Sequence, residues 1–189
     1  MFKKIKIFLL TLLTPIQKFM QKLGRSEPLM NRKSVDLAMS LIKEGDILLS
    51  FEKQRSTSFF IKGKYKHAAI VSPKLDVIEA VGGGVRDVDL EEWLFLMDYV
   101  AIIRPEFENH TINYMASCNA MTYIGKPYDY KFQSGDKAIY CSELVYLCYQ
   151  NELKEFLSEY ERSEILPQVF RDLADKPDSK FKLIYEFQG

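Results

Sequence analysis

Short apolar runs follow one another through most of the chain, and glycine, proline or polar residues close each run. Apolar runs of this kind, bounded by turn residues, predict buried β-strands. Turn residues such as Ser72-Pro73 and Gly82-Gly83-Gly84 separate neighbouring runs. We therefore expect strands at residues 47–51, 67–71, 75–81, 85–88, 100–104 and 181–187.

Between these runs the apolar residues lie three and four positions apart, which is the period of an amphipathic helix. Strands and helices do not alternate strictly, so the order favours an α+β fold with an antiparallel sheet packed against helices. We expect helices at residues 34–43, from Asp89, at 111–124, from Cys141 and at 169–174, with one or two helical turns within 56–64.

The first 30 residues form a separate segment. Over residues 1–23, apolar side chains recur every three or four positions with lysines largely on the other side, which predicts a basic amphipathic helix. Residues 24–28 resemble a linker. The helix fits three interpretations: a helix lying in a membrane interface, a signal or anchor segment, and a helix that packs on the domain or a partner. Its apolar run at 7–13 is shorter than the roughly 20 residues of a membrane span.

Length and composition suit one globular domain, which we place at residues 31–189. The chain has 189 residues with 26 basic and 26 acidic side chains, and this balance argues against a nucleic-acid partner. Three cysteines and two histidines, without a CxxC pair, leave little material for a disulfide framework or a zinc site. A reduced, reactive thiol is the simpler expectation.

Cys141 begins an apolar-periodic segment, and turn and capping residues at 134–136 precede it. We therefore expect it at a helix N-terminus, where unpaired N–H groups and the helix dipole favour a thiolate. This makes Cys141 the candidate nucleophile, and a small core residue is the alternative interpretation. Cys118 and Cys148 lie within predicted helices and fit core or unreactive thiols.

A cysteine nucleophile needs a base, and the base needs a third group to orient it. His67 begins a predicted strand before two small alanines, whereas His110 lies among polar residues, so His67 is the better candidate. Pairing this strand with the next one places His67 opposite Glu79. A carboxylate within an apolar strand is costly without a partner, and it stabilises a charged imidazole.

Several short motifs occur together and in order between residues 45 and 150: Gly45-Asp-Ile-Leu, His67-Ala-Ala-Ile-Val, Ile78-Glu-Ala, Gly84-Val-Arg, Gly125-Lys-Pro-Tyr and Tyr140-Cys-Ser-Glu-Leu-Val-Tyr. The last two resemble the nucleophile segment of the NlpC-type, papain-like cell-wall peptidase superfamily. Here the histidine precedes the cysteine. That order is similar to the circularly permuted branch of YiiX/YebB-like proteins and their lecithin-retinol-acyltransferase relatives.

The resemblance implies a circularly permuted papain-like (NlpC-type) fold, with Cys141 as nucleophile, His67 as base and Glu79 as the orienting residue. It also implies that Tyr128 donates its hydroxyl to an oxyanion, although Tyr128 also fits a core aromatic. No metal or organic cofactor is implied. The chain departs from the family pattern at two places. Glu143 replaces a usual glycine, and Lys131 and Phe132 lie near the place of a usual Gly-Gly pair. Glycines allow a ligand backbone to approach closely, so both departures concern the shape of the substrate cleft.

The expected reaction is acyl transfer through a thioester. A cysteine hydrolase acting on an amide bond, of peptide or peptidoglycan-stem type, follows from the main superfamily. An esterase or acyltransferase acting on acyl lipids at a membrane surface follows from the acyltransferase relatives and would use residues 1–23 for membrane contact. A non-catalytic module that binds peptide or lipid is the third alternative. A bacterial cytoplasmic or membrane-associated location is favoured, with a signal or anchor segment left open.

Overall fold

The computed structural model describes residues 30–52, 61–109, 111–132, 137–158, 160 and 165–188. The predictions for the helix at 1–23, for His110 and for the capping residues at 134–136 lie outside these residues, as do residues 56–60 of the helical turns expected within 56–64. Residues 61–64 are described and are not helical. Within the described ranges, no helix combines the length and apolar character needed to cross a membrane.

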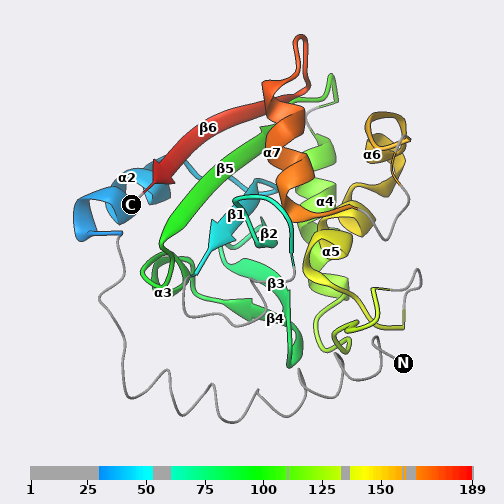
Figure 1. The fold of residues 1–189 in the computed structure, drawn as a ribbon, viewed down its shortest axis with the longest axis horizontal. Coiled ribbons are helices and arrows are strands. Elements are labelled where there is room, and N and C mark those ends of the chain that lie inside the picture. Colours follow the sequence, from blue (N-terminus) through cyan, green and yellow to red (C-terminus); the bar gives the residue numbers. More distant parts are fainter. Residues whose placement is uncertain are drawn as a thin grey trace.

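One six-stranded sheet organises the described residues, in the order β4-β3-β2-β1-β5-β6 (Figure 1). Every neighbouring pair is antiparallel, so the α+β prediction with an antiparallel sheet is confirmed. The six predicted strands are all present: β1 Ile47–Phe51, β2 His67–Val71, β3 Val77–Val81, β4 Gly84–Val88, β5 Tyr99–Pro105 and β6 Phe181–Gln188.

Helices cover both faces of the sheet, in two groups that lie to the right and to the left of the strands in Figure 1. The first group contains α4 (Thr111–Thr122), α5 (Cys141–Cys148), α6 (Gln150–Phe156) and α7 (Pro167–Asp175). The second contains α2 (Arg32–Leu41) and α3 (Leu90–Leu94). The pattern predicted all of them except α6. Helix α7 begins two residues earlier than expected because Pro167 suits a first helical turn.

Each central strand contributes side chains to two separate cores, because successive residues point to opposite faces of a sheet. In β1, Ile47 and Leu49 pack with the α4–α7 group, while Leu48 packs with α2 and α3. Burial on both faces explains why these strands read as nearly continuous apolar runs and not as alternating ones.

The β2–β3 hairpin pairs two residues away from the predicted register. Ala69, and not His67, lies directly opposite Glu79. Leu75 adopts a left-handed φ of 64°, and the N–H of Asp76 donates to Ser72 Oγ at 3.1 Å. Residues 72–76 form the turn, so the pairing is centred on residue 74, and β3 starts at Val77, two residues later than expected. The prediction that His67 directly faces Glu79 is wrong for this reason.

A buried ion pair fixes the beginning of β1. Asp46 is buried and accepts two hydrogen bonds from the guanidinium of Arg104, at 2.8 and 2.7 Å. The N–H of Lys43 donates to the same carboxylate at 2.8 Å. Arg104 and Lys43 both belong to the scaffold, so the Gly45-Asp46 motif organises structure.

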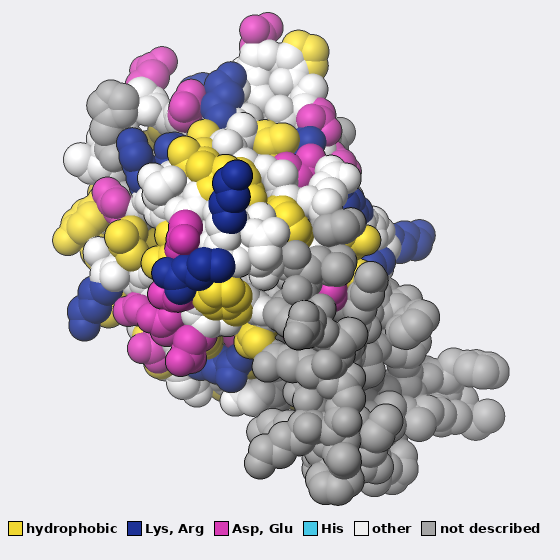
Figure 2. Space-filling view, turned by 90° about the vertical axis from the view of Figure 1, so that its left-hand side faces the viewer, with side chains coloured by type: hydrophobic (Ala, Val, Ile, Leu, Met, Phe, Trp, Pro, Cys, Tyr) yellow, Lys and Arg dark blue, Asp and Glu magenta, His cyan; other side chains and the backbone are white. Residues whose placement is uncertain are grey.

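The side of the molecule formed by α2 and α3 carries charges of both signs. Figure 2 shows lysine and arginine side chains beside aspartate and glutamate, with apolar residues between them and no broad area of one sign. This mixture agrees with the zero net charge of the chain.

Candidate active site

Cys141 is the first residue of α5 and is only 3% exposed. Tyr140 precedes the helix in an extended conformation, and its N–H donates to the Glu143 carboxylate at 3.4 Å. The side chain of Cys141 thus lies at the positive end of the helix dipole, as the sequence predicts.

His67 is the first residue of β2 and is 5% exposed. Its imidazole forms a hydrogen bond with the Cys141 thiol, and the N–H groups of Ala68 and Ser142 also point to the sulfur. Burial raises the pKa of the Cys141 thiol, but the hydrogen bond and charge of His67, together with these N–H groups, outweigh burial and lower it. The geometry therefore favours a thiolate.

Glu79 lies on β3 and contacts His67 diagonally across the hairpin. Its Oε2 lies 2.7 Å from His67 Nε2, and the two side chains share one face because their positions differ by two from the direct pairing. The contact at Nε2 leaves Nδ1 as the nitrogen available to the thiol. Cys141, His67 and Glu79 are thus brought together in this order.

Two further residues bind the Glu79 carboxylate, and the sequence reasoning missed both. Arg86 donates from Nε and a terminal nitrogen to Oε1 at 3.0 and 2.6 Å, and Trp93 Nε1 donates to Oε2 at 3.1 Å. Arg86 stands directly opposite Glu79 in the β3–β4 hairpin, so pairing about the glycine turn could have identified it. No local signal marks Trp93, which reaches Glu79 from α3.

Tyr128 lies on a segment that runs beside the start of α5. It forms an isolated parallel bridge with Ile139, and its ring contacts that of Tyr130 edge-on, with 5.0 Å between centroids. Tyr128 is half-buried and packs against the core that contains α5. Its role as an oxyanion donor stays a prediction.

The glycine turn between β3 and β4 docks this tyrosine segment. Gly84 has a φ of 110°, and a Cβ on it would lie 2.7 Å from the carbonyl oxygen of Lys126. Val85 donates its N–H to the same oxygen at 2.8 Å, and Tyr130 donates its hydroxyl to the Gly82 carbonyl at 2.6 Å. The Gly82–Gly84 turn was predicted as a plain loop, and this docking was not foreseen.

The other two cysteines differ from Cys141. Cys148 is buried near the end of α5, and burial raises the pKa of its thiol. Cys118 is half-buried within α4 and interacts with Tyr114. In the described structure, His67 contacts Cys141, which separates this thiol chemically from Cys148.

Comparisons with known proteins identify the family to which the chain belongs. Residues 41–183 match the family described as "Permuted papain-like amidase enzyme, YaeF/YiiX, C92 family". The uncharacterized protein YiiX of Escherichia coli strain K12 is 40% identical over 63 residues, which span 30% of this chain and 30% of that relative.

A solved structure extends the likeness to the fold. The crystal structure of metalloprotein YiiX from Escherichia coli O157:H7 matches with a TM-score of 0.62 at 24% identity, covering 79% of this chain and 99% of that one. The family match spans most of the 189 residues. The chain therefore belongs to the YaeF/YiiX family of permuted papain-like amidase enzymes.

Proposed function

We propose that this protein is a cysteine hydrolase that cleaves an amide bond of peptide or peptidoglycan-stem type through Cys141, His67 and Glu79. One observation carries the proposal: a thiol at a helix N-terminus is hydrogen-bonded to an imidazole whose other nitrogen lies 2.7 Å from a buried carboxylate. A nucleophile, a base and an orienting group in this order are the parts that acyl transfer needs. The family's amidase chemistry supports the same reading.

The proposed reaction has two stages. The Cys141 thiolate attacks the amide carbonyl, and the resulting oxyanion takes hydrogen bonds from N–H groups at the start of α5 and from the Tyr128 hydroxyl. The tetrahedral intermediate collapses, the C–N bond breaks, and the imidazolium of His67 gives its proton to the leaving amine. His67 then removes a proton from water, which attacks the thioester and releases the acid and the free thiol.

Glu79 holds the imidazole in one orientation and stabilises its charged form during this cycle. Its own burial is compensated by the Arg86 cation and by the indole N–H of Trp93. Among the described residues, no cluster of three or more His, Cys, Asp or Glu side chains suits a metal ion, and no step in the proposal uses one.

A second candidate is a hydrolase or acyltransferase that acts on acyl lipids at a membrane surface. The basic amphipathic pattern of residues 1–23 favours it, because such helices bind anionic interfaces. Deleting residues 1–23 separates the two candidates. A lipid enzyme should lose vesicle binding and activity together, whereas an amidase acting on soluble peptides should keep its activity.

The test is a screen of peptide amides, peptidoglycan stem peptides and acyl esters against the full chain. Cys141→Ala and His67→Ala serve as paired variants. The proposal predicts amide turnover that falls by about 10⁴-fold or more without the thiol, and an acyl-enzyme mass on Cys141 when a slow substrate is trapped. Turnover that survives in Cys141→Ala contradicts the proposal, and turnover of esters alone favours the lipid candidate. The absence of both, with ligand binding retained, favours a non-catalytic binding module.

A further inference from the structure

The residues Ile165–Gln168, called here the α7 brace, contact the chain neighbours of both Cys141 and His67. Ser142, next to Cys141, is buried and donates its hydroxyl to the carbonyl of Ile165 at 2.6 Å. Gln168 Oε1 accepts the N–H groups of Lys64 and Tyr65, at 2.9 and 3.3 Å. Tyr65 lies two residues before His67. One short segment therefore ties together the approaches to both reacting side chains.

The chain before His67 depends on contacts of this kind, because residues 61–66 belong to no helix or strand. Gly63 has a φ of 95°, and a Cβ there would lie 2.5 Å from the side chain of Gln168. The backbone of residues 63–65 thus lies directly against Gln168. On the other side, Lys66 donates its N–H to the Ser50 carbonyl at 2.9 Å.

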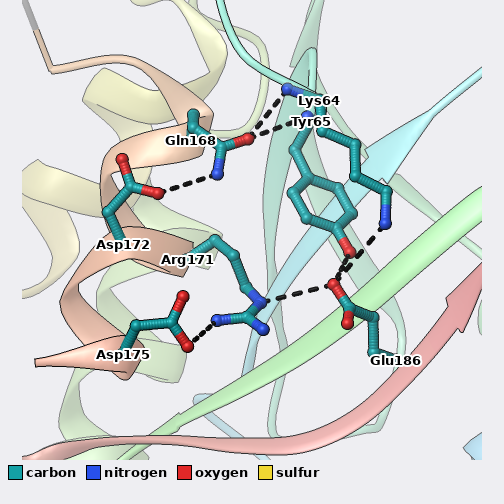
Figure 3. Close-up of polar contacts among 7 residues, drawn as sticks. All are labelled: Lys64, Tyr65, Gln168, Arg171, Asp172, Asp175 and Glu186. Carbon is teal, nitrogen blue, oxygen red and sulfur yellow. Dashed lines mark hydrogen bonds and ion pairs between the residues drawn. The ribbon is translucent and has the colours of Figure 1, made fainter.

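A second set of bonds holds the ring of Tyr65 (Figure 3). The Tyr65 hydroxyl donates to Glu186 Oε1 at 2.5 Å, and Arg171 on α7 donates from Nε to the same oxygen at 3.3 Å. Burial and the neighbouring Glu186 carboxylate raise the pKa of Tyr65, so its hydroxyl remains a donor. Gln168 itself is oriented by Asp172, which accepts from its Nε2 at 2.8 Å.

We propose that Gln168 is a positioning residue: by binding the backbone of Lys64 and Tyr65, it fixes His67 relative to Cys141. The inference rests on the proposed function, because it concerns the Cys141–His67 pair. It goes further by assigning a role to the start of α7. This part of the chain follows the helix of Cys141, but it accepts hydrogen bonds from residues 64 and 65, just before His67. Displacement of a reacting group by about 1 Å can cost about 100-fold in rate, so small errors at residues 64–65 matter.

The test compares the rate of Cys141 alkylation against pH, resolved by peptide mass spectrometry, in the full chain and in Gln168→Leu. The leucine has similar size but cannot accept the two N–H groups. Loss of the brace should reduce Cys141 alkylation near pH 6 by about tenfold, equivalent to a shift of one pKa unit. If the leucine variant does not fold, Gln168→Ser replaces it. The serine side chain is too short to reach residues 64–65, so the same tenfold fall in Cys141 alkylation is expected.

Two further variants separate positioning from general damage. Gln168→Glu combined with Asp172→Asn keeps an acceptor toward residues 64–65 and reverses the polarity of the bond between 168 and 172, so it should restore the low-pH alkylation. Asp175→Asn removes only the negative charge of a mostly exposed carboxylate that pairs with Arg171 on the same helix, so its pH profile should match that of the unmodified chain.

The possible results are distinct. A low-pH rate that is present in the unmodified chain and persists in Gln168→Leu and Gln168→Ser overturns the brace and leaves the proposed function standing. An ordinary thiol profile in the unmodified chain overturns both. Loss in Gln168→Leu with recovery in the double variant supports the brace, whereas equal loss in Asp175→Asn overturns it by showing that any change on α7 has the same effect.

Discussion

Arg86 neutralises the carboxylate that orients His67, and its removal offers a quantitative test of that role. The side chain of Glu79 is 1% exposed, whereas that of Arg86 is 55% exposed. Arg86→Met keeps much of the aliphatic length but removes both hydrogen bonds to Glu79 Oε1. Glu79 would keep its bonds with His67 and Trp93 but would lose this cation.

The expected loss of stability follows from these exposures. Hydrogen bonds to charged groups contribute about 1.5–3 kcal/mol each, but solvent screens a half-exposed arginine and reduces this value. We expect a net loss of about 2 kcal/mol in the free energy of unfolding. For a chain of this size, that corresponds to a fall of about 4–8 °C in Tm.

Arg32→Met is the matched control. Arg32 also bonds carboxylates, those of Asp36 and Glu91, but its side chain is 65% exposed and both partners are substantially exposed. Exposed pairs contribute about 0–1 kcal/mol, so this variant should stay close to the parent protein. Urea unfolding and thermal melting of both variants provide the measurement. Equal losses in the two, or no loss in Arg86→Met, would refute the view that Arg86 compensates a buried charge.

Three other predictions concern the surroundings of Cys141. Tyr128→Phe should lower amide turnover by about 100- to 1000-fold with little change in Tm, as expected for one oxyanion donor, and steady-state kinetics would detect it. Gly84→Ala forces a side chain toward the Lys126 carbonyl at positive φ and should destabilise the fold by at least about 1 kcal/mol, whereas Gly83→Ala, with no atom within 4 Å of the added Cβ, should be neutral in urea unfolding. Because burial raises the pKa of Cys148, its alkylation should stay slow even at pH 9, and similar rates at Cys148 and Cys141 would contradict this.

The strands could be predicted because their physical cause is local. Helices cover both faces of the sheet, so the strands appear as apolar runs closed by turn residues. Their register depends on turn conformation, and the left-handed Leu75 gave no signal in its residue type. A leucine at positive φ is rare, so the strand was expected to start at Leu75. It starts at Val77, and the pairing differs by two residues from the expected one.

The candidate site was predictable where chemistry restricts the choice. The sequence has two histidines, and an acidic residue within an apolar strand calls for a partner, so His67 and Glu79 could be named with Cys141. Trp93 could not be named, because an aromatic residue in an amphipathic helix usually fills a core. Gln168 is linked to Lys64 and Tyr65 over about a hundred positions, and only the tertiary fold brings them together.

The most direct test of the Cys141–His67 pair is the pH dependence of alkylation at Cys141, with Cys118 and Cys148 measured in the same digest and His67→Ala measured alongside. The His67 contact lowers the pKa of Cys141, so the thiolate persists as the pH falls below the range in which an ordinary thiol becomes protonated. A thiolate–imidazolium pair predicts that Cys141 alone reacts fast near pH 6 and that His67→Ala abolishes this reaction. If Cys141 titrates as an ordinary thiol, or if its low-pH reactivity survives in His67→Ala, the thiolate–imidazolium pair does not exist and the proposed function is wrong.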